Sequence, residues 1–475
     1  MNEYRIEKDS VGQKEVPLDA YYGIQTLRAI ENFPITGYRL DTAFINAMAT
    51  VKKAAAKANT ETGYLNPEIS DVIIKACNEI LEGKWHDQFL VDPIQGGAGT
   101  STNMNMNEVI ANRALELMGE KKGNYSVISP NTHVNMSQST NDALPTASHI
   151  AILARLEELF DVMKDLYKEF ENKAKEFDDI IKMGRTHLQD AVPIRLGQEF
   201  KSYANVLKRD IERIKATRKH LCDVSIGATA VGTGLNADVE YIGKTIKYLG
   251  EYTGMPIRMV NNLVDGTANT DGYLDTSSAL KNCMLNMSKI SNDLRLMASG
   301  PHCGLGEINL PARQPGSSIM PGKVNPVMPE VLNQVAFQVA GNDLTISMAS
   351  EAGQFEINAM KPIIIFKLLE SIKMMTSVLE VFSKYCLSGI AANKQKLEQF
   401  VNTSAGTMTA LNPHVGYELS AQMAEEVLNS GRTVREVVLE NGALTVEELD
   451  IILDPYDMTN PGISGKELLK NKKKH

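Results

Sequence analysis

The chain has 475 residues, of which 43% are hydrophobic, so it is long enough to bury sizeable cores in two or three domains. Its formal net charge of −9 argues against a surface that attracts nucleic acid or an anionic membrane as a whole. The five cysteines show no C-x-x-C spacing and the first residues no apolar leader, so we expect a reducing cytoplasm and neither a disulfide framework nor a zinc site.

Residues 1–140 are expected to form a loop-rich N-terminal domain with three helices, over 43–62, 68–82 and 104–118. A glycine-rich turn at 95–103 leads into the third of these helices. The hydroxyl groups of this turn, together with the free N–H groups of the helix start, could hold an anion. The same residues are equally suited to capping the helix and nothing more.

Residues 141–395 are expected to form a central domain of long helices, because apolar residues recur there at helical spacing. The five predicted helices cover 142–180, 193–224, 272–299, 326–350 and 356–393. Pro362 lies inside the fifth and is expected either to kink it or to mark its true start. Several of these helices are apolar on more than one face, which predicts oligomerisation through the bundle.

Residues 396–475 are expected to form a small C-terminal domain. Short helices are predicted there over 416–430 and 445–452, between turns rich in glycine and proline.

Residues 316–326 read Gly-Ser-Ser-Ile-Met-Pro-Gly-Lys-Val-Asn-Pro. The glycines permit unusual backbone angles and the prolines stiffen the chain, a pattern typical of a loop that closes over a site and then leads into a helix. Three further polar segments, Thr100-Ser101, 137–142 and 184–190, precede or open expected helices. The N–H groups and the positive dipole end of a helix start favour an anion.

The sequence of residues 316–326 resembles the signature of the fumarase/aspartase superfamily, and the resemblance extends over essentially the whole chain. Members eliminate a group from C2–C3 of a succinate skeleton and leave a fumarate unit. The resemblance implies a mainly α, three-domain fold whose central five-helix bundle assembles into the helical core of a homotetramer. It also implies a dicarboxylate site built from the four polar segments of three subunits, without an organic cofactor. No clustered carboxylates with the spacing of metal ligands occur in the sequence.

The resemblance assigns a role to ten residues of the four segments. Ser317 corresponds to the base that takes the C3 proton, which requires help from loop N–H groups and from Lys323 because a free serine is a poor base. His187 is the rival base, since histidine titrates near neutral pH. The residues implied to bind substrate are Thr100, Ser139, Thr140 and Ser318 at the β-carboxylate, Lys323 and Asn325 at the α-carboxylate, and Asn141, Thr186 and His187 near the amino group. Such donors would stabilise the enediolate left by proton removal.

Two classes within the superfamily compete. Segments 96–103, 138–142 and 350–354 follow the pattern of enzymes that release ammonia from L-aspartate, which is the reaction we expect. Lys361, where those enzymes commonly carry glutamate, and His302-Cys303, in place of a usual arginine, depart from it. The alternative is a class II fumarate hydratase. A non-catalytic helical scaffold is the remote alternative, against which the intact polar segments argue.

Overall fold

The computed structural model describes residues 3–472, which are mainly helical. They form two compact units. The first unit consists of residues up to 161, 210–285 and 335–377. The second consists of 162–209, 286–334 and the residues from 378 onwards. The prediction of a mainly α chain with long central helices is confirmed.

The first unit begins with an antiparallel hairpin, and several helices follow it. These elements are β1 (Tyr4–Asp9), β2 (Gly12–Pro17), α1 (Ile24–Asn32), α2 (Thr42–Glu61), α3 (Pro67–Leu81), the 3-10 helix η1 (His86–Gln88), α4 (Thr100–Leu117) and the π-helix η2 (Pro130–Val134). The predicted helices over 43–62, 68–82 and 104–118 correspond to α2, α3 and α4. Asp41 caps α2 by accepting the N–H of Ala43, and Asn66 caps α3 by accepting that of Glu68.

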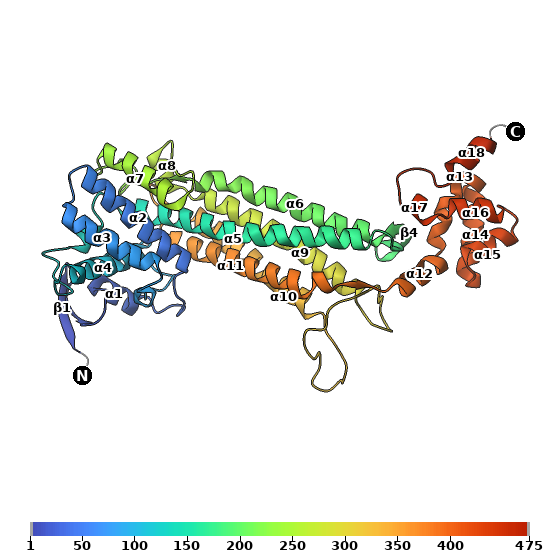
Figure 1. Ribbon diagram of the computed structural model, residues 1–475, viewed down its shortest axis with the longest axis horizontal. Coiled ribbons are helices and arrows are strands. Elements are labelled where there is room, and N and C mark those ends of the chain that lie inside the picture. The colour runs from blue at the N-terminus through green and yellow to red at the C-terminus, as the bar shows by residue number, and fades with distance from the viewer. Residues whose placement is uncertain (1–2, 473–475) are drawn as a thin grey trace. The chain divides into compact units, whose positions relative to one another are not determined.

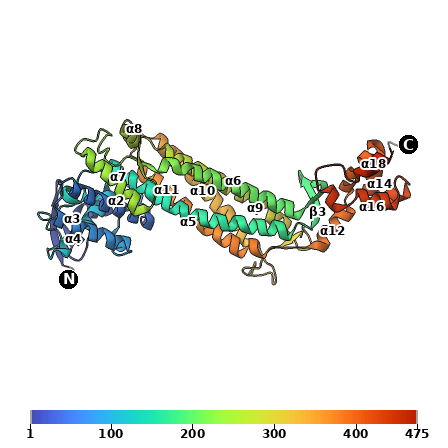
Figure 2. The same cartoon turned by 45° about the horizontal axis from the view of Figure 1, so that its top comes forward.

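Five long helices lie side by side in both views of the chain (Figures 1 and 2). They are α5 (Thr140–Glu176), α6 (Leu196–Leu221), α9 (Asp271–Met297), α10 (Val327–Glu351) and α11 (Lys361–Tyr385). All five were predicted within a few residues, except that the fifth is shorter at both ends. Pro362 is the second residue of α11, so it marks the true start of that helix and does not kink it.

Residues 181–195 form a β-hairpin that the sequence reading missed, with strands β3 (Ile181–Thr186) and β4 (Gln189–Arg195). Segment 184–190 precedes the second long helix, as expected, but it forms the tip of this hairpin and is separated from the start of α6 by the rest of β4. His187 and Leu188 form its two-residue turn with φ of 55° and 61°. Hairpin turns of this kind need left-handed residues and usually contain glycine or asparagine, so this turn carries no sequence signal.

The remaining short elements connect the long helices. In the first unit they are β5 (Asp223–Val224), α7 (Val239–Thr253), β6 (Arg258–Met259) and α8 (Leu263–Ala268). In the second they are β7 (Ile308–Asn309), the 3-10 helix η3 (Leu387–Gly389) and β8 (Ala391–Ala392). Strands β7 and β8 pair with each other, so the residues just before the 316–326 loop are joined to the end of the bundle.

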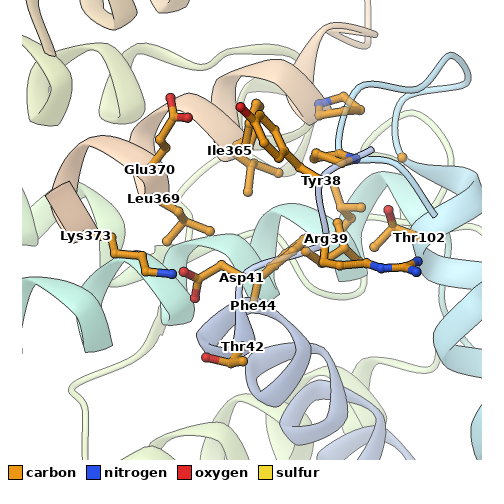
Figure 3. Close-up of a pocket in the computed structure, with 16 residues that line it drawn as sticks. Tyr38, Arg39, Asp41, Thr42, Phe44, Thr102, Ile365, Leu369, Glu370 and Lys373 are labelled. Carbon is orange, nitrogen blue, oxygen red and sulfur yellow. The ribbon is translucent and has the colours of Figure 1, made fainter. Parts of the chain in front are cut away.

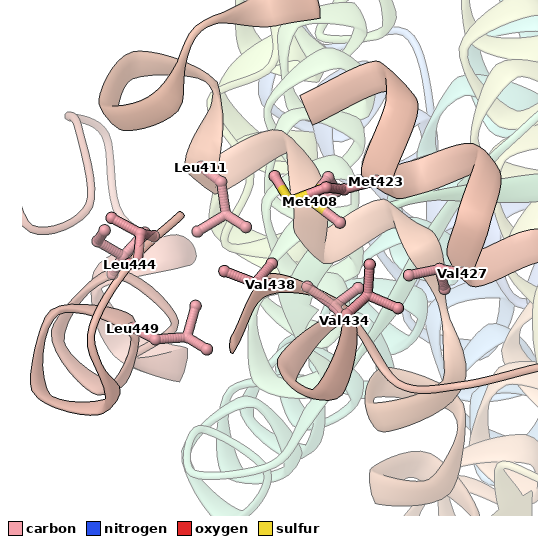
Figure 4. Packing of buried hydrophobic residues seen from close by; sticks show 10 residues of the cluster. Met408, Leu411, Met423, Val427, Val434, Val438, Leu444 and Leu449 are labelled. Atoms are coloured by element: carbon pink, nitrogen blue, oxygen red, sulfur yellow. The ribbon is translucent and has the colours of Figure 1, made fainter. Parts of the chain in front are cut away.

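The C-terminal helices of the second unit pack around their own hydrophobic core (Figure 4). These elements are α12 (Lys394–Thr403), the 3-10 helix η4 (Ala405–Leu411), α13 (Asn412–Val415), α14 (Tyr417–Ser430), α15 (Val434–Glu440), α16 (Val446–Ile452), α17 (Pro455–Met458) and α18 (Lys466–Lys472). The predicted helices over 416–430 and 445–452 are α14 and α16. Leu411 and Leu449 are fully buried in this core, and capping boxes begin α15 and α16.

Among residues 3–472, no helix is long and apolar enough to span a bilayer. All five cysteines are free thiols, of which Cys303 is exposed and the other four are buried.

Candidate active site

The ten predicted site residues fall into two groups, one in each unit. The first unit holds Thr100, Ser139, Thr140 and Asn141. The second holds Thr186, His187, Ser317, Ser318, Lys323 and Asn325. Each unit therefore carries two of the four segments, and neither carries all of them.

In the first unit, a glycine brings the starts of α4 and α5 together. Gly99 precedes Thr100 with φ of 92°, and a Cβ atom at this position would lie 2.4 Å from Cδ1 of Leu144. Only glycine allows both this backbone angle and this approach. Thr100 is exposed, and its Oγ1 donates to the Gly97 carbonyl at 2.8 Å. The two predicted segments of this unit are thus neighbours.

The first turn of α5 is held by its own side chains. Ser139 Oγ accepts the N–H of Asn141 at 3.2 Å, and Asp142 Oδ1 accepts the N–H of Ser139 at 3.0 Å. Asp142 is fully buried, and desolvation raises its pKa to about 7. Its second oxygen accepts the N–H groups of Gly227 and Thr229 at 3.1 and 2.8 Å. A loop far away in sequence therefore fixes the segment that carries Thr140 and Asn141.

Beneath these helix starts lies a buried lysine that sequence reasoning did not single out. Lys52 Nζ donates to Asn103 Oδ1 at 2.7 Å, Asn135 Oδ1 at 3.0 Å and Gln138 Oε1 at 2.9 Å. All three protons of the ammonium group thus have an acceptor. Desolvation nevertheless lowers the pKa of Lys52 to about 7. The only signal in the sequence is a lysine within a helix of small apolar residues.

In the second unit, the hairpin carries Thr186 at the end of β3 and His187 in the turn, and both side chains are exposed. Arg185 anchors the hairpin, because its Nη1 donates to Glu307 Oε1 at 2.7 Å. Glu307 is fully buried and also contacts Lys182 Nζ at 2.8 Å. One carboxylate therefore neutralises two cations of the same strand.

Glu307 also belongs to the segment that leads to the 316–326 loop. It directly precedes β7, and its carbonyl accepts the N–H of Asn393 at 2.9 Å. The two predicted segments of this unit, the hairpin and the loop, thus share one buried anchor. Sequence reasoning missed Glu307 because its partners lie more than a hundred residues away.

The ends of the 316–326 loop are tied together. The N–H of Gly316 donates to the Lys323 carbonyl at 2.8 Å, and Asn325 Nδ2 donates to the Gly316 carbonyl at 2.8 Å. A Cβ atom at position 316 would lie 2.5 Å from the Lys323 oxygen, so this closure requires glycine. The side chain of Lys323 is exposed.

Inside this loop, two backbone donors point at the predicted base. Ser317 Oγ accepts the N–H groups of Ile319 at 3.2 Å and Met320 at 3.0 Å. Hydrogen bonds to an oxygen favour its deprotonated form, so this arrangement suits a serine that must become an alkoxide. Ser318 is exposed beside it.

The three residues that depart from the expected pattern, Lys361, His302 and Cys303, lie in different environments. Lys361 begins α11 and is fully buried, and its Nζ donates to the Thr267 carbonyl at 2.6 Å in the last turn of α8. A cation at a helix C-terminus stabilises its free carbonyls. Burial lowers the pKa of Lys361 to about 8. His302 and Cys303 are exposed.

Taken by type, the predicted residues supply hydroxyls, amides, one ammonium and one imidazole. These groups can donate to the oxygens of a dianion and stabilise charge that develops on it. Within residues 3–472, no three His, Cys, Asp or Glu side chains gather as metal ligands would.

Two sequence families match the chain. The family described as Lyase matches residues 12–341, and the one described as Fumarase C C-terminus matches 408–460. The chain belongs to this lyase family, the fumarase/aspartase superfamily.

Individual relatives of this lyase align with nearly the whole length of its chain. It is 62% identical over 468 residues to a curated aspartate ammonia-lyase from Bacillus subtilis, covering 98% of each chain. Among solved structures, it resembles a fumarate lyase:delta crystallin from Brucella melitensis bound to cobalt, with a TM-score of 0.94 and 46% identity over 97% of this chain and 100% of that one. A class II fumarase from Schistosoma mansoni gives a TM-score of 0.93 and 35% identity over the same shares.

Proposed function

We propose that this lyase is an aspartate ammonia-lyase, which converts L-aspartate reversibly to fumarate and ammonia. The observation that carries the proposal is the near full-length similarity to curated aspartate ammonia-lyases, which is much higher than the similarity to the class II fumarase. The amino group as leaving group also agrees with the threonine at position 140, where hydratases usually carry serine.

In the proposed mechanism, Ser317 takes the proton from C3 of aspartate. The electron pair of the C–H bond moves into an enediolate on the β-carboxylate, where hydroxyl donors stabilise the added charge. The C2–N bond then breaks, the C2–C3 double bond forms, and the amino group leaves as ammonia. The two N–H groups directed at Ser317 Oγ support its role as the base, because they stabilise its alkoxide.

The other predicted residues bind the substrate. We assign Thr100, Ser139, Thr140 and Ser318 to the β-carboxylate, Lys323 and Asn325 to the α-carboxylate, and Asn141, Thr186 and His187 to the surroundings of the amino group. No step requires an organic cofactor, because the substrate's own carboxylate accepts the electron pair.

We further propose a cytoplasmic homotetramer whose sites are shared between three subunits. An apolar stripe on α10 supports assembly through the helices: Phe337, Leu344 and Met348 are 65%, 62% and 67% exposed and recur at positions i, i+7 and i+11. That spacing places them on one face of the helix, and large exposed apolar patches mark interfaces. The division of the four segments between two units agrees with sites completed by other copies.

The substrate is tested by following the ultraviolet absorbance of fumarate with L-aspartate and, separately, with L-malate. We expect fumarate and an equal amount of ammonia from L-aspartate. Turnover of malate but not of aspartate would identify a hydratase, and turnover of neither would favour a non-catalytic scaffold.

Shared sites are tested by mixing two inactive variants, Ser317→Ala and Asn141→Ala, under conditions that let subunits exchange. If the two residues of one site come from different chains, hybrid assemblies contain some wholly native sites and regain activity. No recovery, with hybrids verified by mass, would contradict sharing. A mixture of Ser317→Ala with Ser318→Ala is the matched control, because both changes lie on one loop and cannot complement.

A further inference from the structure

A cavity of about 380 Å³ lies in the first unit beside the start of α4 (Figure 3). Its volume falls within the range of small-molecule sites. Most of its wall is apolar and comes from four parts of the chain: Leu40 and Phe44 before and in α2, Pro93 and Gly99 before α4, Leu144 in α5, and Ile365 and Leu369 in α11.

Two aromatic rings line the cavity from separate elements. Tyr38, in the segment before α2, and Phe366, in α11, have ring centroids 5.9 Å apart and planes tilted by 46°. Rings at this separation pack against each other, so they form one continuous aromatic part of the cavity wall.

Two carboxylates of the cavity wall are already committed to partners outside it. Asp41 Oδ1 accepts both Nε and Nη2 of Arg155, at 3.1 and 2.8 Å. Glu370 accepts from Lys367 Nζ at 2.8 Å and from Asn342 Nδ2 at 3.0 Å. Their charges are therefore compensated, and they do not attract a cationic ligand.

The two cations of the cavity wall, Arg39 and Lys373, are less well compensated by opposite charges than these carboxylates. Among the described residues, neither Arg39 nor Lys373 forms an ion pair, and the hydrogen bond of Arg39 goes to the neutral Leu90 carbonyl at 3.2 Å. Figure 3 shows the ammonium of Lys373 directed toward Asp41, and the guanidinium of Arg39 on the Thr102 side of the cavity. Arg39 is thus the group best suited to pair with an incoming anion.

We propose that this cavity binds a small carboxylate with an aromatic or branched apolar body, held by Arg39 at its charged end. The cavity wall includes Gly99 and Leu144, the two residues whose close approach sets the starts of α4 and α5. A bound ligand packs against both Leu144 and Gly99 and so stabilises the neighbouring Thr100 and Thr140 turns. Occupancy therefore lowers the KM for aspartate, and this regulatory part rests on the proposed function.

Calorimetric titration of the full-length protein with 3-phenylpropionate tests the binding without reference to activity. We expect one saturable site per chain, and binding at least about tenfold weaker for the neutral amide of the same acid. Arg39→Gln weakens binding by a similar factor, whereas the matched change Lys373→Gln alters it by less than about threefold. Leu369→Trp fills the cavity and abolishes binding.

Three results would overturn the site: no saturable binding, as when a partner chain covers the cavity; equal binding of acid and amide; or unchanged binding by Arg39→Gln. Aspartate kinetics with and without the probe then test regulation. An unchanged KM, with binding intact, overturns regulation alone. A protein that binds the probe but does not turn over aspartate refutes the proposed function and leaves the site standing.

Discussion

Replacing Glu307 with glutamine tests whether one buried carboxylate holds two segments of the active site. Glu307 is fully buried and contacts Arg185 at 2.7 Å and Lys182 at 2.8 Å. Removing one partner of a buried ion pair costs about 3–5 kcal/mol, because the remaining charge is left uncompensated. Glutamine keeps one acceptor oxygen and Lys182 keeps its contact with Glu199, so we expect a loss of about 3 kcal/mol in unfolding free energy.

Glu199→Gln is the matched control. Glu199 contacts Lys182 at 3.0 Å, but its side chain is 22% exposed. Replacing it leaves the Arg185–Glu307 pair intact. We therefore expect a loss of about 1 kcal/mol, as for a partly solvated pair. Because Arg185 stays anchored, the hairpin tip with Thr186 keeps its position.

Urea denaturation and fumarate formation from L-aspartate, measured on the same preparations, separate stability from positioning. A misplacement of about 1 Å can cost about a hundredfold in rate, so Glu307→Gln lowers kcat by at least about tenfold while still folded. Glu199→Gln stays within about threefold of the wild type. Equal effects of the two changes on kcat, or none from Glu307→Gln, would refute the reasoning.

Three further substitutions test the packing of the fold and the pH dependence of its stability. Gly99→Ala forces φ of 92° on alanine and drives its Cβ into Leu144, so it lowers the unfolding free energy by about 1–3 kcal/mol and raises the KM. The double variant Gly99→Ala with Leu144→Ala should recover part of the lost stability in urea denaturation and part of the increase in KM. Leu449→Ala opens a cavity in the C-terminal core and costs about 2–5 kcal/mol, and an unchanged urea transition would contradict that packing. Burial lowers the pKa of His149 to about 4 from 6.5, so the unfolded chain binds more protons between these pH values. Stability therefore rises as the pH increases from about 4 to 6.5 and is lost as the pH is lowered through this window, by about 3 kcal/mol in total, and His149→Asn flattens that part of the curve.

The long helices were predictable because their apolar periodicity is a local property of the sequence. The aspartate and asparagine caps of α2 and α3, and Pro362 near the start of α11, follow from the same local chemistry. The hairpin at 181–195 was not predictable, because its turn uses His187 and Leu188 in left-handed conformations that these residues rarely adopt. Strand pairing over so short a segment leaves no periodic pattern.

The candidate site was predictable only as four separate segments. Lys52 and Glu307 connect these segments, but they act through partners distant in sequence, so no local pattern identifies them. The domain boundaries near 140 and 395 stay a prediction. The boundaries of the two compact units fall within the long helices, because each unit groups neighbouring segments of different helices and not whole helices.

The most direct measurement for the proposed mechanism is turnover and substrate binding by the Ser317→Ala variant. If Ser317 takes the C3 proton, the variant binds L-aspartate with nearly wild-type affinity in calorimetry and forms no fumarate above background. Fumarate formation at a near wild-type rate would show that another group is the base and would contradict the mechanism proposed for this site.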